Sequence, residues 1–252
     1  MLTDLQVARY SRQIILPSVG GRGQQQLLSA AVTVAGRPGM ARVVAMYLAA
    51  AGIGRVFLIG AGRAVCDDLE TLNPDCRVTD VGWPLADAAL DRMIDQSRAV
   101  VCAAGGTTTG ARLDTRCLVA RRPLLYGRVS GTLGEAALLG AGPDGEPCFE
   151  CYSRHGTPDH AAATVAPPMP AGAAHGALAA AIGAFIGTIL ATEAIKLTLN
   201  LGSLLAGHRL VYDALSGTLS NAAIGATPGC VACGARQGGG SSVRMESGDW
   251  NR

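Results

Sequence analysis

Four of the eight cysteines stand in two pairs that have the spacing of metal ligands. These pairs are Cys148-Phe-Glu-Cys151 and Cys230-Val-Ala-Cys233. A C-x2-C pair lets two thiolates reach one ion from a tight turn, and two such pairs complete a tetrahedral site for zinc. Pro228, Gly229 and Gly234 favour such a turn around the second pair. Because four thiolates leave no open coordination position, the sequence predicts a structural zinc site.

Two other interpretations of these pairs stay open, namely unrelated reduced thiols and redox-active pairs. A redox pair is expected at the start of a helix that follows a strand, and the sequence places neither pair there. Cys102 and Cys117 fall in apolar stretches, where we expect small core residues. Residues 1–10 are polar and carry no secretory signal. We therefore expect a cytoplasmic protein whose cysteines are reduced or metal-bound.

The composition predicts one α/β domain over residues 1–236 and a disordered tail over 237–252. Hydrophobic residues make up 49% of the 252 residues and charged residues 16%, which excludes a largely disordered chain. The formal net charge of +2 gives no support for nucleic-acid or anionic-membrane binding. Residues 171–192 are apolar enough to span a membrane, but a span there would separate the two cysteine pairs. We therefore expect a buried helix.

The hydrophobic pattern predicts the order in which strands and helices follow one another. A β-branched run at 31–35, a glycine turn, an apolar helix at 40–51 and a second strand at 55–59 form the opening unit of a doubly wound nucleotide-binding sheet. Further expected strands are 99–103, 123–126, 135–139 and 209–212. Further expected helices, after a helical N-terminal region at 3–30, are 85–96, 113–121 and 176–200. The fold class expected is a Rossmann-like, mostly parallel sheet with a zinc-knuckle C-terminal part.

Several blocks in this order resemble the ThiF/MoeB/HesA family, which is related to ubiquitin-activating enzymes. The resemblance covers roughly residues 5 to 236 and implies a Rossmann-like fold, a four-cysteine zinc site and a dimer. It also implies ATP-dependent adenylation of a C-terminal carboxylate, often on a ubiquitin-like sulfur carrier. The blocks are Arg9-Tyr-Ser-Arg-Gln-Ile-Ile-Leu-Pro17 with Gly20 and Gly23-Gln24, Tyr47–Gly54, Leu72-Asn-Pro74, Gly145–Cys151, Glu193–Lys196, Tyr212-Asp-Ala214 and Pro228–Cys233.

The nucleotide site departs from the family pattern at several positions. The family's G-x-G-G-x-G turn is replaced by Gly36-Arg-Pro-Gly39-Met-Ala41, in which Gly36 and Gly39 remain as weak candidates for nucleotide binding. No carboxylate follows the strand at 55–59 to hold a ribose, and no lysine precedes Lys196. Residues 104–109 (AGGTTT) stand where the family has an Asp-Asn pair for Mg²⁺. Ordinary use of ATP and Mg²⁺ is therefore not expected.

One catalytic element of the family is retained in the sequence. An arginine at the position of Arg12 reaches into the partner subunit's nucleotide site in this family, and Ser11-Arg12-Gln13 fits that pattern. The simpler interpretation is an arginine that pairs with a local carboxylate. Under the functional interpretation, Arg12 acts in trans on an active partner, which gives a homodimer or a heterodimer with an active paralogue.

These features lead to a preferred interpretation and two alternatives. The preferred one is a ThiF/MoeB-like protein that does not use ATP itself and serves as a non-catalytic dimer partner or scaffold in carboxylate adenylation. Its substrate would be a ubiquitin-like carrier or a peptide. The first alternative is an active adenylyltransferase with an atypical pocket that uses Arg37, Arg63 or the threonines at 107–109. The second is a Rossmann-like protein that binds another ligand.

Overall fold

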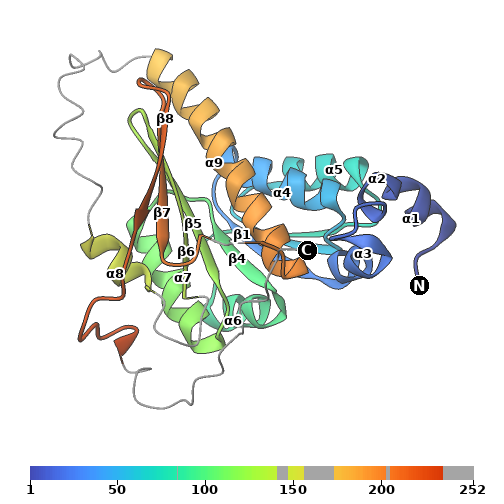
Figure 1. Cartoon of the computed structure of the whole chain (residues 1–252), viewed down its shortest axis with the longest axis horizontal. Coiled ribbons are helices and arrows are strands. Elements are labelled where there is room, and N and C mark those ends of the chain that lie inside the picture. Colours follow the sequence, from blue (N-terminus) through green and yellow to red (C-terminus); the bar gives the residue numbers. More distant parts are fainter. Residues whose placement is uncertain (84, 141–146, 156–172, 203–204, 235–252) are drawn as a thin grey trace, which may run out of the picture.

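An eight-stranded mixed sheet organises the computed structural model of this protein (Figure 1). The structure describes residues 1–83, 85–140, 147–155, 173–202 and 205–234. The strand order is β3-β2-β1-β4-β5-β6-β7-β8. The strands are β1 (Ala31–Ala35), β2 (Arg55–Ile59), β3 (Arg77–Val81), β4 (Ala99–Cys102), β5 (Leu124–Ser130), β6 (Leu133–Leu139), β7 (His208–Asp213) and β8 (Thr218–Ala223).

Strands β1 to β5 are parallel, and β5 to β8 are antiparallel. Strands β1 and β4 are buried on both faces, which is why they read as continuous apolar runs in the sequence. The chain runs from β1 to β2 and β3 on one side and then returns to β4 on the other. The carboxyl ends of β1 and β4 therefore lie at the topological switch point, where ligands bind in open α/β sheets.

Helices cover both faces of the sheet. The helices are α1 (Asp4–Arg9), α2 (Ser11–Ile14), α3 (Gly20–Ser29), α4 (Met40–Ala51), α5 (Arg63–Leu72), α6 (Asp87–Gln96), α7 (Thr107–Ala120), α8 (Phe149–Arg154) and α9 (Ala173–Leu199). Figure 1 shows α4, α5 and α9 on one face and α6 and α7 on the other. Each face has its own cluster of buried apolar side chains, so the domain is a three-layer α/β/α structure.

The long apolar helix α9 packs inside the fold. Its side chains Ile182, Ile186 and Leu190 are at most 1% exposed and join the core cluster with α4. A Cβ atom at Gly187 would lie 3.1 Å from the backbone oxygen of Met40, so glycine permits this close crossing. Leu178–Leu199 is long and apolar enough to cross a membrane, yet nearly half of its most apolar stretch is buried in the fold. The expectation of a buried helix is therefore confirmed.

The sequence predicted most elements within a few residues of their bounds. The main exceptions are α5, α8, β3 and β8, which were not predicted, and α7, which begins six residues earlier than expected. The expected mostly parallel Rossmann-like sheet is confirmed. The expected boundary at residue 236 and the tail at 237–252 lie outside the described residues.

Candidate functional site

The four predicted metal ligands lie together in the structure. The Sγ atoms of Cys148, Cys151, Cys230 and Cys233 all lie within 4.8 Å of one another. The sulfur–sulfur distances are 3.8 Å for Cys148–Cys151, 3.6 Å for Cys148–Cys230 and 3.5 Å for Cys151–Cys233. A tetrahedron with metal–sulfur bonds of about 2.3 Å has edges of about 3.8 Å. The four thiols therefore fit a structural zinc ion.

The first cysteine pair sits at the start of helix α8. Cys148 is the N-cap of this helix, whereas the sequence placed neither pair at a helix N-terminus, so that expectation was wrong. The buried carboxylate of Asp114 accepts a hydrogen bond from the backbone N–H of Phe149 at 3.0 Å and holds the helix start against α7. Clustering of all four sulfurs, rather than one isolated pair, still favours the metal site over a redox pair.

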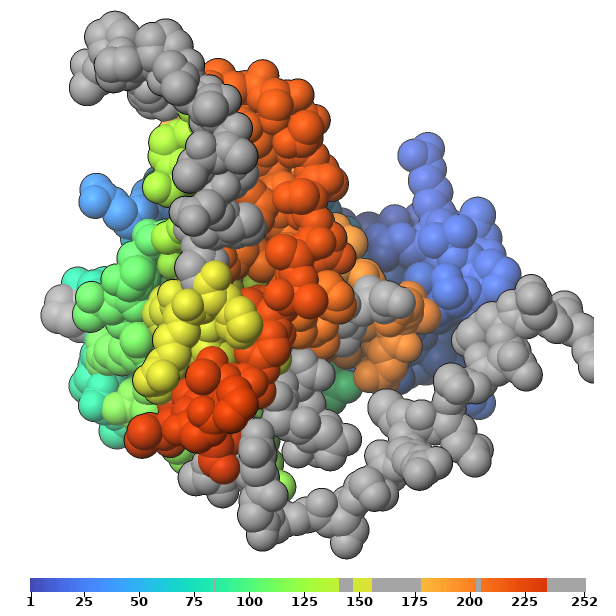
Figure 2. All heavy atoms as spheres, turned by 60° about the vertical axis from the view of Figure 1, so that its left-hand side comes forward, coloured from blue at the N-terminus to red at the C-terminus, as the bar shows by residue number. Residues whose placement is uncertain are grey.

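The second cysteine pair lies in the turn that the flanking glycines predicted. Gly229 has φ of 71°, and the backbone N–H of Cys230 donates to Thr227 O at 3.0 Å. Burial raises the pKa of the Cys151 thiol, but hydrogen bonds, first from the Thr227 backbone, outweigh it and lower the pKa to about 7. Figure 2 shows α8 side by side with the segment at 225–234, which brings the two pairs together.

A pocket of about 230 Å³ opens at the carboxyl ends of β1, β2 and β4, on the switch point of the sheet. Its lining follows the strand ends in order: Ala35, Gly36 and Arg37 after β1, Ile59 and Gly60 after β2, Trp83 after β3, Ala104 after β4 and Thr109 in α7. Among these lining residues there is no carboxylate, which matches the losses noted in the sequence. Sequence reasoning missed Trp83; its only signal was an aromatic residue just beyond a strand.

The two retained glycines have clear backbone roles. A Cβ atom at Gly36 would lie 2.7 Å from the backbone oxygen of Ala103, so glycine allows the β1 turn to approach the end of β4. Gly39 has φ of 114° and precedes helix α4, a conformation that favours glycine. Gly36 lines the pocket directly. Their predicted part in nucleotide binding remains a prediction.

The other residues offered for the atypical pocket lie at different distances from it. Arg37 is exposed and lines the pocket, and Thr109 does so from the first turn of α7. Arg63 begins α5 and forms an exposed ion pair with Asp67 at 3.1 Å. Asp68 pairs with Arg42 at 2.7 Å on the same surface. Of the candidates named from the sequence, Arg37 and Thr109 are therefore the ones placed to contact a ligand.

The N-terminal block of the resemblance is fixed to the Leu72-Asn-Pro74 block by buried hydrogen bonds. The Asn73 amide donates to the hydroxyl of Tyr10 at 2.8 Å and to Ala49 O at 2.6 Å. Asp75 accepts from the Tyr10 hydroxyl at 3.1 Å and pairs with Arg9 at 3.1 Å. Burial is the main cause that raises the pKa of Tyr10 to about 12.

This network holds the short helix α2, which carries Arg12. The Arg12 side chain is exposed and makes no hydrogen bond or ion pair within the part of the chain that the structure describes. The local carboxylate at Asp75 is taken by Arg9 instead. The structure thus leaves Arg12 available at the surface, and its action in a partner subunit remains a prediction.

A buried charged cluster connects the sheet to α8. Glu135 in β6 is 1% exposed and accepts from Arg128 at 2.6 Å and from the Tyr152 hydroxyl at 2.5 Å. Arg209 in β7 lies with its guanidinium 4.0 Å from the Tyr152 ring centre and donates to Tyr152 O at 2.6 Å. The cluster fixes α8, and with it the first cysteine pair, against β5, β6 and β7.

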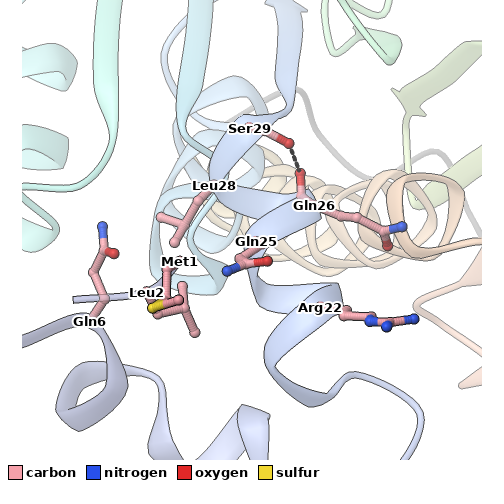
Figure 3. Close-up of a pocket in the computed structure, with 8 residues that line it drawn as sticks. All are labelled: Met1, Leu2, Gln6, Arg22, Gln25, Gln26, Leu28 and Ser29. Carbon is pink, nitrogen blue, oxygen red and sulfur yellow. Dashed lines mark hydrogen bonds between the residues drawn. The ribbon is translucent and has the colours of Figure 1, made fainter. Parts of the chain in front are cut away.

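A larger hollow of about 710 Å³ lies elsewhere, between the start of the chain and helix α3. Figure 3 shows side chains of Leu2, Gln6, Gln25 and Leu28 around it. Its lining contains amides, apolar groups and Arg22, but no carboxylate, cysteine or histidine. None of its lining residues follows the carboxyl end of a strand, so the smaller pocket at the switch point is the better candidate for chemistry.

The fold and site define a ThiF-type protein, and the comparisons agree. The ThiF family matches residues 63–232, and the chain belongs to this family. Three named relatives match nearly end to end. The SAMP-activating enzyme E1 of Haloferax volcanii is 32% identical over 96% of this chain and 93% of its own length. The sulfur carrier protein adenylyltransferase of Thermus thermophilus is 29% identical, covering 92% of each. The molybdopterin-synthase adenylyltransferase of Escherichia coli is 28% identical over 92% and 98%.

Solved structures share the fold at lower identity. The crystal structure of E. coli MccB with ATP superposes with a TM-score of 0.68 at 19% identity, covering 90% of this chain and 74% of that chain. The crystal structure of PaaA superposes with a TM-score of 0.69 at 16% identity, covering 89% and 84%. These similarities confirm the fold expected from the sequence.

Proposed function

We propose that this chain binds ATP in the pocket at the switch point and adenylates the C-terminal carboxylate of a small carrier protein or peptide. The observation that carries the proposal is the position of the pocket, beside a glycine turn at the N-terminus of the 12-residue helix α4. Support comes from relatives that match the chain nearly end to end and are named as adenylyltransferases or activating enzymes. They favour the active alternative over the non-catalytic partner that the sequence alone favoured.

The lining of the pocket suggests how a nucleotide would lie. The N-terminus of α4 and the exposed Arg37 offer positive charge, so the phosphates belong at this end. The ligand would then extend across Gly60, where the family has a ribose-binding acid, toward Trp83. The indole of Trp83 lies 5.1 Å from the guanidinium of Arg112, which is itself held by Asp87 at 2.6 Å.

Stacking on Trp83 would replace affinity that the missing ribose carboxylate no longer supplies. Trp83 is 41% exposed, so part of its ring is accessible to a ligand. Stacking of a base on an aromatic side chain contributes about 1–3 kcal/mol. This is comparable to a charge-assisted hydrogen bond of about 1.5–3 kcal/mol. A pocket without the carboxylate can therefore still hold the adenosine half of ATP.

The proposed step is attack of a carboxylate oxygen on the α-phosphorus of ATP. The new bond joins that oxygen to phosphorus, the bond to the bridging oxygen breaks, and pyrophosphate leaves. Arg37 would offset charge on the phosphates, and Arg12 of a second subunit would add a further cation. The described pocket residues offer no carboxylate for Mg²⁺, which prefers such ligands, so the step is assigned only to the chain's own cations, Thr109 and backbone N–H groups.

ATP–pyrophosphate exchange tests this proposal. The purified chain, incubated with ATP, labelled pyrophosphate and candidate carriers that end in a free C-terminal carboxylate, is expected to return label to ATP. The Arg37→Gln variant should exchange more slowly by about tenfold or more. The matched variant Arg92→Gln, which removes an exposed arginine on α6, should match the wild type. Exchange at background level with every carrier would oppose the proposal.

A second candidate is the non-catalytic partner, and the absence of any carboxylate among the described pocket residues favours it. In this case the chain would form a heterodimer with an active paralogue and donate Arg12 to its site. Co-purification would recover the paralogue, and Arg12→Ala would leave the complex intact but slow its adenylation step. Exchange by the chain alone would exclude this candidate.

Eight free, buried cysteines are compatible with a cytoplasmic setting for either function.

A further inference from the structure

A polar hollow of about 380 Å³ lies beneath the amino ends of β1, β4 and β5, on the edge of the sheet opposite the ATP pocket. We call it the arginine hollow, after Arg98 and Arg122 in its wall. Its other polar lining includes Gln26, Ser29, Gln96 and Asn200. Among the residues that line it there is no aspartate or glutamate. The arginine hollow is thus a concave site with two cations and no counter-charge.

The register of the sheet brings the two arginines together. Val100 pairs with Leu124, so Arg98 and Arg122, each two residues earlier, lie just before the amino ends of the neighbouring strands β4 and β5. Neighbouring strands lie about 4.8 Å apart, so the backbones of both arginines lie at the same edge of the sheet, and both residues line the hollow. In the part of the chain that the structure describes, neither arginine forms an ion pair. Two like charges without a carboxylate repel each other, and an anion between them would relieve this repulsion.

The hydrogen bonds already made by residues of the hollow leave amide donors unused. Arg98 donates to the Asn200 side-chain oxygen at 3.0 Å, and Arg122 donates to Asp95 O at 2.8 Å. The side-chain oxygen of Gln96 accepts from Arg55 at 3.3 Å. Because these contacts use the amide oxygens, the NH₂ groups of Asn200 and Gln96 remain as donors. The Nε of Arg122 also has no hydrogen-bond partner in the described part, but it is shielded from solvent and so does not itself open onto the hollow.

Helix α3 closes one side of the hollow. Figure 3 shows Gln26 and Ser29 next to each other, with the Ser29 hydroxyl donating to Gln26 O at 3.0 Å. This bond fixes the last turn of α3, and the Gln26 side chain stays available to a ligand. Donors therefore surround the hollow from α3, from the strand ends and from the residue that follows α9. Such an arrangement suits a tetrahedral oxyanion with several acceptor oxygens better than a planar carboxylate.

We propose that the arginine hollow binds a phosphate group, held by Arg98 and Arg122. This site is separate from the ATP pocket and does not depend on the proposed function. The phosphate could be free or part of a small phosphate monoester, since both present the same oxygens. Nucleic acid fits less well, because the lining contains no aromatic side chain on which a base could stack.

Calorimetric titration with inorganic phosphate, at constant ionic strength set with chloride, tests the proposal. Phosphate is expected to bind, and Arg98→Gln to weaken it by about tenfold or more. Arg98 is exposed, so its variant should keep the wild-type melting temperature even if Arg122→Gln, which loses the bond to Asp95 O, is less stable. Arg92→Gln on α6 is the matched control for loss of one exposed positive charge, and Arg37→Gln is the control for the ATP pocket.

The outcomes separate the possibilities. Equal phosphate affinity in Arg98→Gln and wild type would overturn the proposal, and so would loss of binding in Arg37→Gln alone, because phosphate would then occupy the ATP pocket. A second titration with glycerol 3-phosphate identifies the source. Tighter binding of the monoester, lost in Arg98→Gln, supports a phosphorylated metabolite, whereas equal or weaker binding supports free phosphate. Absence of any phosphate binding by the wild-type protein contradicts the site.

Discussion

The phenolic oxygen of Tyr10 lies 2.8 Å from the side-chain amide of Asn73, 63 positions further along the chain. This hydrogen bond joins two blocks that lie far apart in the sequence, and Asp75 extends it to Arg9. The N-terminal segment that carries Arg12 therefore has a defined place beside the end of α5. The position of Arg12, which the resemblance places in the partner subunit's site, thus depends on a buried hydrogen bond within its own subunit.

Removing the Asn73 side chain should destabilise the fold. Asn73→Ala would remove the buried donor to Tyr10 and one of the two donors to Ala49 O, which keeps only the Gly52 N–H, at a cost of about 2 kcal/mol in the free energy of unfolding. Urea denaturation measures this change. Asn221→Ala, at an exposed position on β8, is the matched control and should change stability by less than about 0.5 kcal/mol. Equal effects of both substitutions would show that the network is not stabilising.

The cysteine cluster should hold one zinc ion per chain. Metal analysis of the purified protein is expected to give about one equivalent. Cys230→Ala should lose the metal and lower the melting temperature by about 5 °C or more, because metal binding contributes to folding. Cys66→Ala, at a buried cysteine outside the cluster, should keep the metal. Zinc well below one equivalent in the wild type would refute the four-cysteine site.

Trp83 should determine affinity for the base of ATP but not for its phosphates. Trp83→Ala is expected to weaken ATP binding by about tenfold, roughly 1.4 kcal/mol, while affinity for tripolyphosphate stays the same. Trp83→Phe should retain most of the ATP affinity. In a Trp250→Phe background Trp83 is the sole tryptophan, so its fluorescence should respond to ATP. Equal loss for ATP and tripolyphosphate would instead indicate a general collapse of the pocket.

Arg12 should act across a dimer if the chain is an active homodimer. Arg12→Ala and Arg37→Gln should each slow exchange, and a mixture of the two variants should recover about a quarter of wild-type activity. Recovery is expected because mixed dimers contain one site with both an intact pocket and an intact Arg12. Arg22→Ala, at an exposed arginine on α3, should have no effect. Failure of the mixture to recover, despite proven subunit exchange, would place Arg12 outside the partner's site.

The sequence predicted the parallel core well because burial on both faces leaves continuous apolar runs such as Ala31–Ala35 and Ala99–Cys102. It missed β3 and β8, whose sequences RVTDV and TLSNAA are largely polar because both lie at the edges of the sheet. Edge strands of this kind carry no buried face that would reveal them. The short helix α8 was also missed, since six residues give too little periodicity.

The candidate site was predictable where spacing fixes geometry and unpredictable where distant segments meet. Two C-x2-C pairs allowed all four zinc ligands to be named. In contrast, the contact of Glu135 with Arg128 and Tyr152 joins two strands to a helix, and nothing in the sequence around Glu135 and Arg128 indicates that these two charges are paired in the core. The role of Trp83 was likewise not predictable from the sequence, because Trp83 enters the pocket only through the pairing of β3 with β2.

Calorimetric titration of the purified chain with ATP tests the central claim most directly, because it needs no knowledge of the carrier. The account predicts saturable binding with a Kd on the order of micromolar, which corresponds to about 8 kcal/mol, and a loss of about tenfold in Arg37→Gln. Absence of binding by the wild-type protein, with zinc bound and the fold intact, would contradict the proposal that this member of the ThiF family uses ATP itself.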